Sequence, residues 1–271
     1  MKKMKKIMAA AIAMMTFSTA AAVTGTVAWF TASNVVTATG MTLQADTEQG
    51  INISNESLAE WKDSIEASHD GTLNDDQARF IPTTTTDANI WKHGNSDDAN
   101  SSTAVGGLVD LTLADAGNGI KKVNNSGSAI HDKNIYLLNK FYLRSSTPLE
   151  IAGKTLYCNS VTASGSTAST LLDMSFRVLV KYGSAVKIYA PFEANQDTDA
   201  PALRPTDKNQ VLGTNVTIPA STANTAATLI EIEVYCYFDG NDSHCKSANI
   251  PTDGVFSNLS VECKFGTETI A

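Results

Sequence analysis

The stretch LDMSFRVLVKY, residues 172–182, decides the fold class, because apolar side chains recur in it at every second position. The apolar positions are Leu172, Met174, Phe176, Val178, Val180 and Tyr182, and the polar positions between them include Asp173, Ser175, Arg177 and Lys181. This period of two predicts a β-strand with one face in a core and the other in water. Strands of this kind are typical of antiparallel sheets.

Two later stretches have the same period: IEIEVYCYF, residues 230–238, and LSVECKF, residues 259–265. Further strands are predicted at 41–45, 50–54, 108–114, 135–144, 149–158, 185–190 and 211–218, which are bounded by turn-forming residues. Only 56–67 has helical spacing, with Leu58, Trp61 and Ile65 on one face. About ten short strands and one short helix predict an all-β fold, a jelly-roll-like antiparallel β-sandwich with long polar loops.

Polar tracts mark the loops and the domain limits. From about residue 83 to 133 the sequence holds TTTTDAN, HGNSDDANSS and NNSGS, so we expect a surface loop insertion there, and a second loop at 193–210. The length and apolar content of 29–271 fit a single sandwich domain. Its first residues, 29–45, are predicted to form an N-terminal strand arm.

The N-terminus has the pattern of an export signal. Lys2, Lys3, Lys5 and Lys6 form a basic region, and no charged residue occurs from Ile7 to Phe30. The run is rich in Ala, Thr and Ser, and both AAA at 20–22 and TVA at 26–28 supply the small residues that signal peptidases accept. We predict a signal peptide at 1–28, cleaved between Ala28 and Trp29. A retained membrane anchor is the alternative, because the run is just long enough to span a bilayer.

The predicted mature chain is acidic. The whole sequence has a formal net charge of −8, and removal of the four leader lysines makes it −12. Such a surface repels nucleic acid and anionic lipid, so we expect no nucleic-acid partner, and contact with a membrane only through an uncleaved leader. Thr, Ser, Asn and Ala are abundant and aromatic residues are few, which favours an exported protein over a cytosolic enzyme.

The cysteines follow the predicted leader, and their number is even. They are Cys158, Cys236, Cys245 and Cys263. In an exported chain an even count predicts at least one disulfide, with three connectivities that the sequence does not separate. Because Cys236 and Cys263 fall on the apolar parity of their strands, buried free thiols are the alternative. Metal binding is disfavoured, since no CxxC spacing or nearby His pair accompanies them.

No catalytic, cofactor or metal site is predicted. The histidines His69, His93, His131 and His244 are far apart, and HExxH, GxSxG and phosphate-binding Gly-rich motifs are absent from the sequence. His244 and Cys245 are neighbours, but adjacent side chains on a strand point apart. Acidic pairs at Asp97-Asp98 and within 239–242 lack the ligand spacing of a calcium loop, so plain turns are favoured. We therefore expect a protein that is not an enzyme.

The run GTVAWFT at 25–31, followed by ATGMTL at 38–43, resembles the leader junction and first strand of the TasA/camelysin group of exported proteins. In that group a Gly-Thr-aromatic-Ala sequence is cut by a dedicated SipW-type signal peptidase just before an Ala/Trp-Phe pair. Here Val27 replaces the aromatic residue, and Ala32-Ser33-Asn34 stands where many members carry an Asp. A looser resemblance lies at Tyr235–Cys245. The resemblance implies a jelly-roll-like subunit of a biofilm-matrix fibre, in the extracellular matrix or at the cell surface of a Gram-positive-type bacterium.

The arm at 29–45 suggests how such subunits would join. It is free of charge and spans about 55 Å when extended. We hypothesise that 29–39 of one subunit adds a strand to an open sheet edge of the next, which would build filaments by self-association. The arm residues expected to fill pockets there are Trp29, Phe30, Val36, Met41 and Leu43. The alternatives are an arm that folds back as the first strand of its own sheet, or an exposed arm without function.

Two other function classes stay open. A monomeric cell-surface adhesin or glycan-binding sandwich would present exposed aromatic residues, such as Tyr235 and Tyr237, on a sheet face or in the 83–133 loops. A peptidase is the other class, because camelysin-like proteins have been classed that way, although no metal motif or triad supports it here. An accessory matrix or anchoring protein is a further candidate partner.

Overall fold

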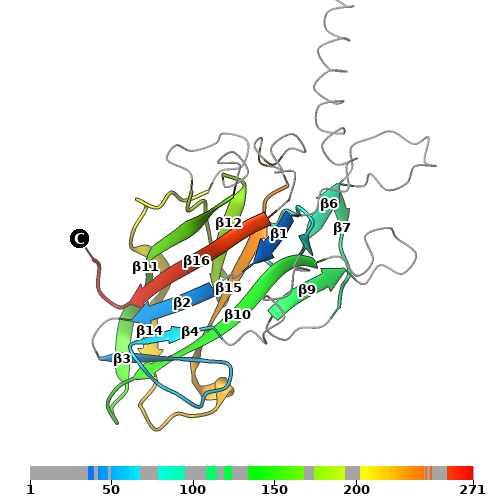
Figure 1. The fold of residues 1–271 in the computed structure, drawn as a ribbon. Helices are drawn as coiled ribbons and strands as arrows, with labels where there is room; N and C mark the ends of the chain where they lie inside the picture. Colours follow the sequence, from blue (N-terminus) through cyan, green and yellow to red (C-terminus); the bar gives the residue numbers. More distant parts are fainter. Residues whose placement is uncertain are drawn as a thin grey trace, which may run out of the picture.

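The computed structural model describes residues 36–39, 42–47, 50–67, 79–94, 108–114, 119–123, 134–167, 174–192, 202–240, 242, 245 and 255–270. These residues form an all-β structure (Figure 1). The elements are β1 (Val36–Thr39), β2 (Thr42–Thr47), β3 (Ile51–Asn55), β4 (Ser64–Glu66), β5 (Arg79–Phe80), β6 (Lys92–Gly94), β7 (Leu108–Asp110), β8 (Leu113–Ala114), β9 (Gly119–Val123), β10 (Asn134–Ser145), β11 (Ile151–Thr167), β12 (Phe176–Tyr182), β13 (Ala185–Tyr189), β14 (Gln210–Ile218), the 3-10 turn η2 (Ala226–Thr228), β15 (Ile230–Phe238) and β16 (Val255–Gly266). Within this part of the chain, no helix has the length and apolarity needed to cross a bilayer.

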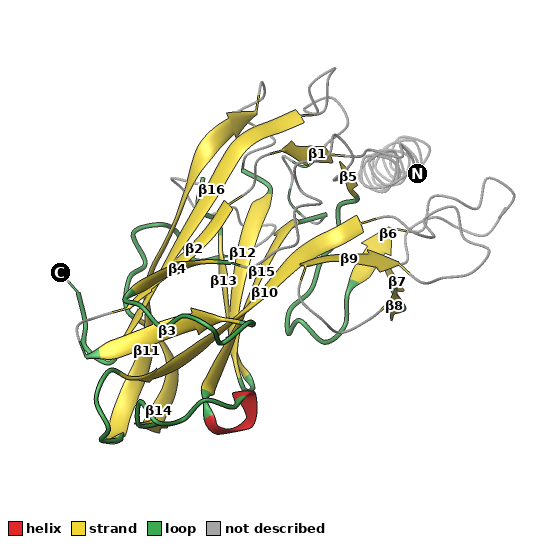
Figure 2. Ribbon diagram, turned by 60° about the horizontal axis from the view of Figure 1, so that its bottom comes forward, coloured by secondary structure: helices red, strands yellow, loops and turns green. Residues whose placement is uncertain are grey.

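The strands pack as two layers around one core (Figure 2). One layer has the order β13-β12-β15-β10, and β3 and β9 pair with the other edge of β10. The second layer has the order β14-β11-β16, and both β1 and β2 pair with the other edge of β16. Most of these pairs are antiparallel, so the predicted all-β sandwich is confirmed. Its jelly-roll connectivity remains a prediction.

The core between the layers is built from the apolar faces that the period of two predicts. The three stretches singled out above contribute Phe176, Val178, Val180, Ile230, Ile232, Val234, Cys236, Phe238, Leu259, Val261, Cys263 and Phe265, all buried. Val178 lies opposite Cys236, and Val180 opposite Val234, so the apolar faces of β12 and β15 coincide. Burial of a large apolar side chain of this kind contributes about 1.5–3 kcal/mol. The first strand of the prediction begins later than expected, because Met174 lies in the turn before β12.

The outer face of the β12-β15-β10 layer is also covered. Tyr235 and Tyr237, which the sequence places in water, are only 4% and 1% exposed. The chain between β5 and β6 crosses this face, and Trp91 packs against it with ring centroids 4.2 Å from Tyr136, 5.8 Å from Tyr235 and 5.0 Å from Tyr237. The prediction of a solvent face at the two tyrosines is therefore wrong, because a period of two does not say what covers the second face.

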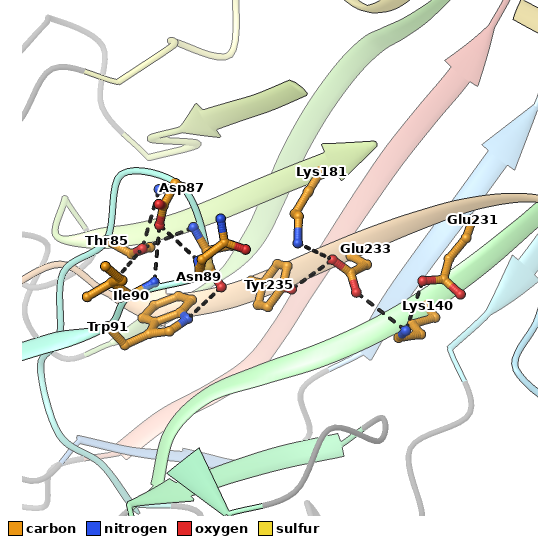
Figure 3. A network of polar contacts seen from close by, with 11 residues as sticks. Thr85, Asp87, Asn89, Ile90, Trp91, Lys140, Lys181, Glu231, Glu233 and Tyr235 are labelled. Carbon is orange, nitrogen blue, oxygen red and sulfur yellow. Dashed lines mark hydrogen bonds and ion pairs between the residues drawn. The ribbon is translucent and has the colours of Figure 1, made fainter. Parts of the chain in front are cut away.

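A compact loop holds Trp91 in place (Figure 3). The Thr85 hydroxyl donates to the carbonyl of Ile90 at 2.7 Å and accepts from the backbone N–H of Ala88 at 3.0 Å. The indole Nε1 of Trp91 donates to the carbonyl of Ala88 at 3.2 Å. Ala88 adopts a left-handed conformation with φ 61°, which costs a non-glycine residue about 1–2 kcal/mol. With Ala88 in this conformation, the loop places the indole of Trp91 against the tyrosines.

Beyond the tyrosines, an ion-pair network continues along the same face (Figure 3). Glu233 accepts from the Tyr235 hydroxyl at 2.9 Å and lies 3.0 Å from Lys181 Nζ and 3.4 Å from Lys140 Nζ. Lys140 also contacts Glu231 at 2.8 Å. Burial alone would raise the pKa of Glu233, but the hydrogen bonds from Lys181 and Tyr235 outweigh it and hold that pKa below its ordinary value. The polar face is therefore charged and paired at neutral pH.

Arg177, predicted to face water, is fully buried, and the prediction is wrong at this position. Its guanidinium donates from Nη2 to Asp242, whose side chain is also fully buried, and its Nε lies 3.9 Å from a carboxylate oxygen of Asp239. It also donates to the carbonyl of Phe176 at 3.1 Å. The acidic stretch 239–242 thus serves as the counter-charge of a buried arginine, which agrees with the turn that the sequence favoured over a calcium site.

The predicted helix at 56–67 is absent and a return turn takes its place. The Asn55 side chain accepts from the backbone N–H of Ser57 at 3.1 Å, and Leu58 has φ 53°, a left-handed conformation that stops a helix. The chain then pairs back, with Lys62 bridged to Ile53 and β4 paired with β2. Trp61 packs under the guanidinium of Arg144, whose carbon lies 3.8 Å from the ring centroid. The spacing of three and four residues between Leu58, Trp61 and Ile65 arises from separate contacts of these side chains and not from one helical face.

The expected loop insertion at 83–133 contributes to the sheet. β9 pairs with β10 and with β8, and Leu111 donates its backbone N–H to Trp91 at 2.8 Å. β6 and β7 form a small antiparallel pair. The sequence missed β5, β6 and β9 because strands of two to five residues are too short for alternation to emerge. Asp97 and Asp98 lie outside the described residues.

The buried ion pair gives a stability prediction. Asp242→Ala leaves the guanidinium of Arg177 without its fully buried carboxylate, so we expect the free energy of unfolding to fall by roughly 3–5 kcal/mol in denaturant titration. The matched control is Asp110→Ala, which removes an exposed partner of Lys92 at 3.6 Å and should cost about 1 kcal/mol or less. Equal losses in the two variants would show that the Arg177 pair is solvated in solution.

Candidate functional site

The N-terminal strand is the candidate site for self-association, because the sequence assigns that role to it. β1 runs parallel to β16, with Thr37 opposite Val255 and Thr39 opposite Ser257. β2 continues parallel to the same strand, with Thr42 opposite Ser260 and Thr47 opposite Phe265. The offset between paired residues is the same for both strands. β1 and β2 therefore lie on one line along the same edge of β16.

This line closes the gap between the two layers (Figure 1). At its upper end β1 also pairs with β5, with Val36 opposite Phe80, and β5 touches β10 in the other layer. At its lower end β2 also pairs with β4. Just before β4 in the chain, Lys62 forms a bridge with Ile53 of β3, which belongs to the other layer. The first residues of the fold thus form the seam along which the layers join.

The two halves of the seam are held very differently. β2 pairs with β16 over six residues and with β4 over three, and its Leu43 and Ala45 side chains are buried in the core. β1 pairs with β16 over three residues and with β5 over two. Backbone hydrogen bonds contribute about 1 kcal/mol each, and burial of the Leu43 side chain contributes about 1.5–3 kcal/mol. Of the two strands, β2 therefore has the more extensive pairing with the rest of the sheet.

The structure places only part of the predicted arm. Val36 begins β1, and Leu43 lies in this chain's own core at 1% exposure rather than in a neighbour. Ala28, Trp29, Phe30 and Met41 lie outside the described residues. In the isolated chain residues 36–39 and 42–47 therefore follow the fold-back alternative that the sequence left open.

The cysteines are four free thiols, and the structure does not contain the disulfide that the sequence favours. Cys158, Cys236, Cys245 and Cys263 are all buried in the core between the layers. Burial raises the pKa of Cys158 and of Cys236 to about 12 and also raises the pKa of the other two. Since the thiolate is the reactive form, these cysteines are neutral packing residues and not nucleophiles.

The described residues include only some of the side chains that could ligate a metal ion. Among the described residues, no three His, Cys, Asp or Glu side chains are grouped to hold a metal ion. His93 lies in β6, whereas His69, His131 and His244 are outside the described residues.

A polar pocket of about 540 Å³ lies beside β2 and the turn after β3. Its lining is Gln44, Asn55, Ser57, Ala59, Glu60, Lys62, Ser64, Ile65 and Glu66. Sites for small molecules are mostly apolar with a few placed polar groups, and this lining has the opposite balance. We assign no ligand to it.

Searches of protein-family models, of curated proteins and of solved structures found no match to this chain. The resemblance to the TasA/camelysin group therefore rests on 25–43 and on Tyr235–Cys245 alone, and it remains a prediction.

The thiol state is directly testable. In the native protein at pH 8 we expect no reaction with a thiol reagent such as dithionitrobenzoate, because every cysteine is buried and neutral. After denaturation without reductant, four thiols should react per chain. A denatured, reduced sample is the control, and a lower count in the unreduced sample would reveal a disulfide and contradict the structure.

Proposed function

We propose that this chain is a secreted structural subunit of an extracellular fibre or biofilm matrix, in which the segment 29–39 of one subunit completes the sheet of the next. The observation that carries the proposal is the position of β1, which is paired on both edges, to β16 and to β5, yet is short and follows a predicted cleavage point. The same strand of a neighbouring subunit could take the place of β1 and form the same backbone pairing with β16 and β5.

Exchange of β1 keeps the pairing that the isolated chain already makes. In the isolated chain the slot is filled by its own residues 36–39, and in a filament it would be filled by the same residues of the neighbour. Such exchange of identical elements is a low-cost route to assembly. β2 would stay in place during the exchange, because its Leu43 and Ala45 side chains are buried in the core.

The geometry favours an open filament over a closed ring when each subunit gives a strand to one neighbour and receives one from another. Such contacts are heterologous and close only if the rotation between subunits happens to do so. The acidic charge of the mature chain opposes unspecific clustering, since like charges repel, whereas strand exchange relies on main-chain hydrogen bonds that are indifferent to it. We also propose the jelly-roll-like strand connectivity and the location in the matrix or at the cell surface of a Gram-positive-type bacterium.

The adhesin alternative expected exposed aromatic side chains at Tyr235 and Tyr237, and both are buried. Tyr235 and Tyr237 are covered by the Trp91 loop and are not available to stack on a sugar ring. No other observation in the described residues favours that class over the fibre subunit, and an accessory anchoring protein is compatible with both.

Locking β1 in its own sheet tests the exchange. In the double variant Thr37→Cys/Val255→Cys the two residues are direct partners of β1 and β16, so oxidation should join them within one chain. We expect the oxidised variant to stay monomeric in electron micrographs and in sedimentation, and reductant to restore filaments.

The native thiols do not interfere because they are buried. Oxidised wild-type protein is the control and should form filaments with or without reductant. Filaments from the oxidised double variant would exclude exchange of β1, and a wild type that stays monomeric at all concentrations would exclude the fibre function itself.

A further inference from the structure

The upper half of β11 is a strand edge that the described part of the chain leaves unpaired. β11 pairs with β16 along nearly its whole length, from Tyr157 to Thr167. On its other edge β14 pairs with it only from Ile151 to Cys158. No described residue bonds to that edge above Cys158 apart from Asn209, whose backbone N–H donates to the carbonyl of Asn159 at 3.0 Å. With respect to the described residues, the outward backbone groups of 160–164 are therefore unpaired over about 16 Å.

Other strand edges in the described part of the two layers are irregular, partly covered or short. β14 has three register irregularities against β11 and a left-handed Asn215, features that blunt an edge. β13 is covered by Leu203, which bonds to Ile188 and Ala190. β3 is bridged by Lys62, and β4 has only three residues. Natural sheets block their edges in these ways to avoid pairing with other chains.

The stretch 160–164 pairs regularly with β16, and the register shifts of that strand pair lie just outside it. Its sequence, SVTAS, has no charge and no proline. Val161 and Ala163 face the core, so Ser160, Thr162 and Ser164 line the outer face, and Thr162 and Ser164 are exposed. Two of its partners on β16, Glu262 and Lys264, are charged, but they form an ion pair at 3.1 Å and offset each other. An incoming strand meets a neutral edge with hydroxyl groups.

We infer that this edge is a self-association surface, on which 160–164 of β11 pairs with the same stretch of a second copy in an antiparallel, two-fold arrangement. Centred on Thr162, the pairing sets Thr162 opposite its own copy and Ser160 opposite Ser164, and hydroxyl pairs of this kind stabilise adjacent strands. On the core side, Val161 meets Ala163. The stretch is thus complementary to itself in every pair.

The ends of the stretch limit the contact to five pairs. Below Ser160, β14 occupies the edge. Above Ser164 the register with β16 shifts, and Gly165 has φ 117°, a conformation that other residues rarely adopt. So short a contact is weak in isolated molecules and becomes effective only where many copies are arrayed, as in a filament whose neighbours lie side by side. In that setting it would bind one filament to another. This role rests on the proposed function, whereas the pairing of two β11 edges does not depend on that function.

A cysteine on the two-fold axis tests the pairing. Thr162→Cys brings two exposed thiols to directly opposed positions, where strand spacing allows a disulfide between copies. The matched control is Thr217→Cys, an exposed threonine on β14. In the purified full chain under mild oxidation, we expect at least about tenfold more cross-linked dimer from Thr162→Cys than from the control. Equal cross-linking in the two variants would overturn the inference.

A charge at the same position gives the second measurement. Thr162→Lys sets like charges opposite each other, so it should separate bundled filaments into single ones, while Thr217→Lys should leave the bundles intact. Bundles that survive Thr162→Lys would refute the edge contact.

The occupant is tested separately. A chain that lacks 29–35 and carries Thr162→Cys should still cross-link, and loss of cross-linking there would name the N-terminal arm as the occupant instead. These results are independent of the fibre proposal, because cross-linking through Thr162 is expected even in the variant whose β1 is locked to β16.

Discussion

Pairing between the first and the last strand of the fold holds the two layers together. β16 lies between β11 on one edge and the line of β1 and β2 on the other. Without that line, β16 would expose an edge along its full length, and β4 and β5 would lose their described partners in this layer. Because backbone groups buried without partners are costly, the N-terminal strand must be supplied from some source. That requirement makes the strand both a structural element and a natural point of exchange.

A second constraint comes from burial on both faces of β15. Ile232 and Val234 face the core between the layers, while Tyr235 and Tyr237 face the Trp91 loop. A strand covered on both sides leaves no water for the polar groups nearby, so Arg177 must find its counter-charge within the protein, and the turn at 239–242 supplies it. A buried ion pair of this kind adds little net stability compared with apolar residues of similar volume, but it forms in only one arrangement of the chain. The turn after β15 is fixed by the arginine on β12.

The sequence predicts the long strands well and their surroundings poorly. The apolar pattern and the bounding turn residues locate β10, β14, β15 and β16 to within a few residues, because the side chains that face the core between the layers recur along each strand. The pattern misplaces Tyr235 and Tyr237, which the Trp91 loop covers, and Arg177, whose counter-charges come from the turn after β15. It predicts a helix at 56–67, because three contacts of different origin happen to recur at helical spacing. For the candidate site, the apolar parity of Leu43 was visible, but its pairing with β16 was not, since a parallel partner more than 200 residues away leaves no local signal.

In the isolated chain β1 pairs within its own sheet, and this bears on how the proposed assembly would be controlled. In the proposed exchange the strand would make the same backbone contacts in a neighbour's sheet as in its own, so the free energy of pairing would nearly cancel between the two states. What remains is the entropy of joining two molecules, which would oppose exchange at low concentration. An uncleaved leader would also hold the strand end at a membrane, so cleavage at Ala28 would release the element that exchanges. Assembly of the proposed kind would be governed by release of the strand and by local concentration more than by the strength of any single contact.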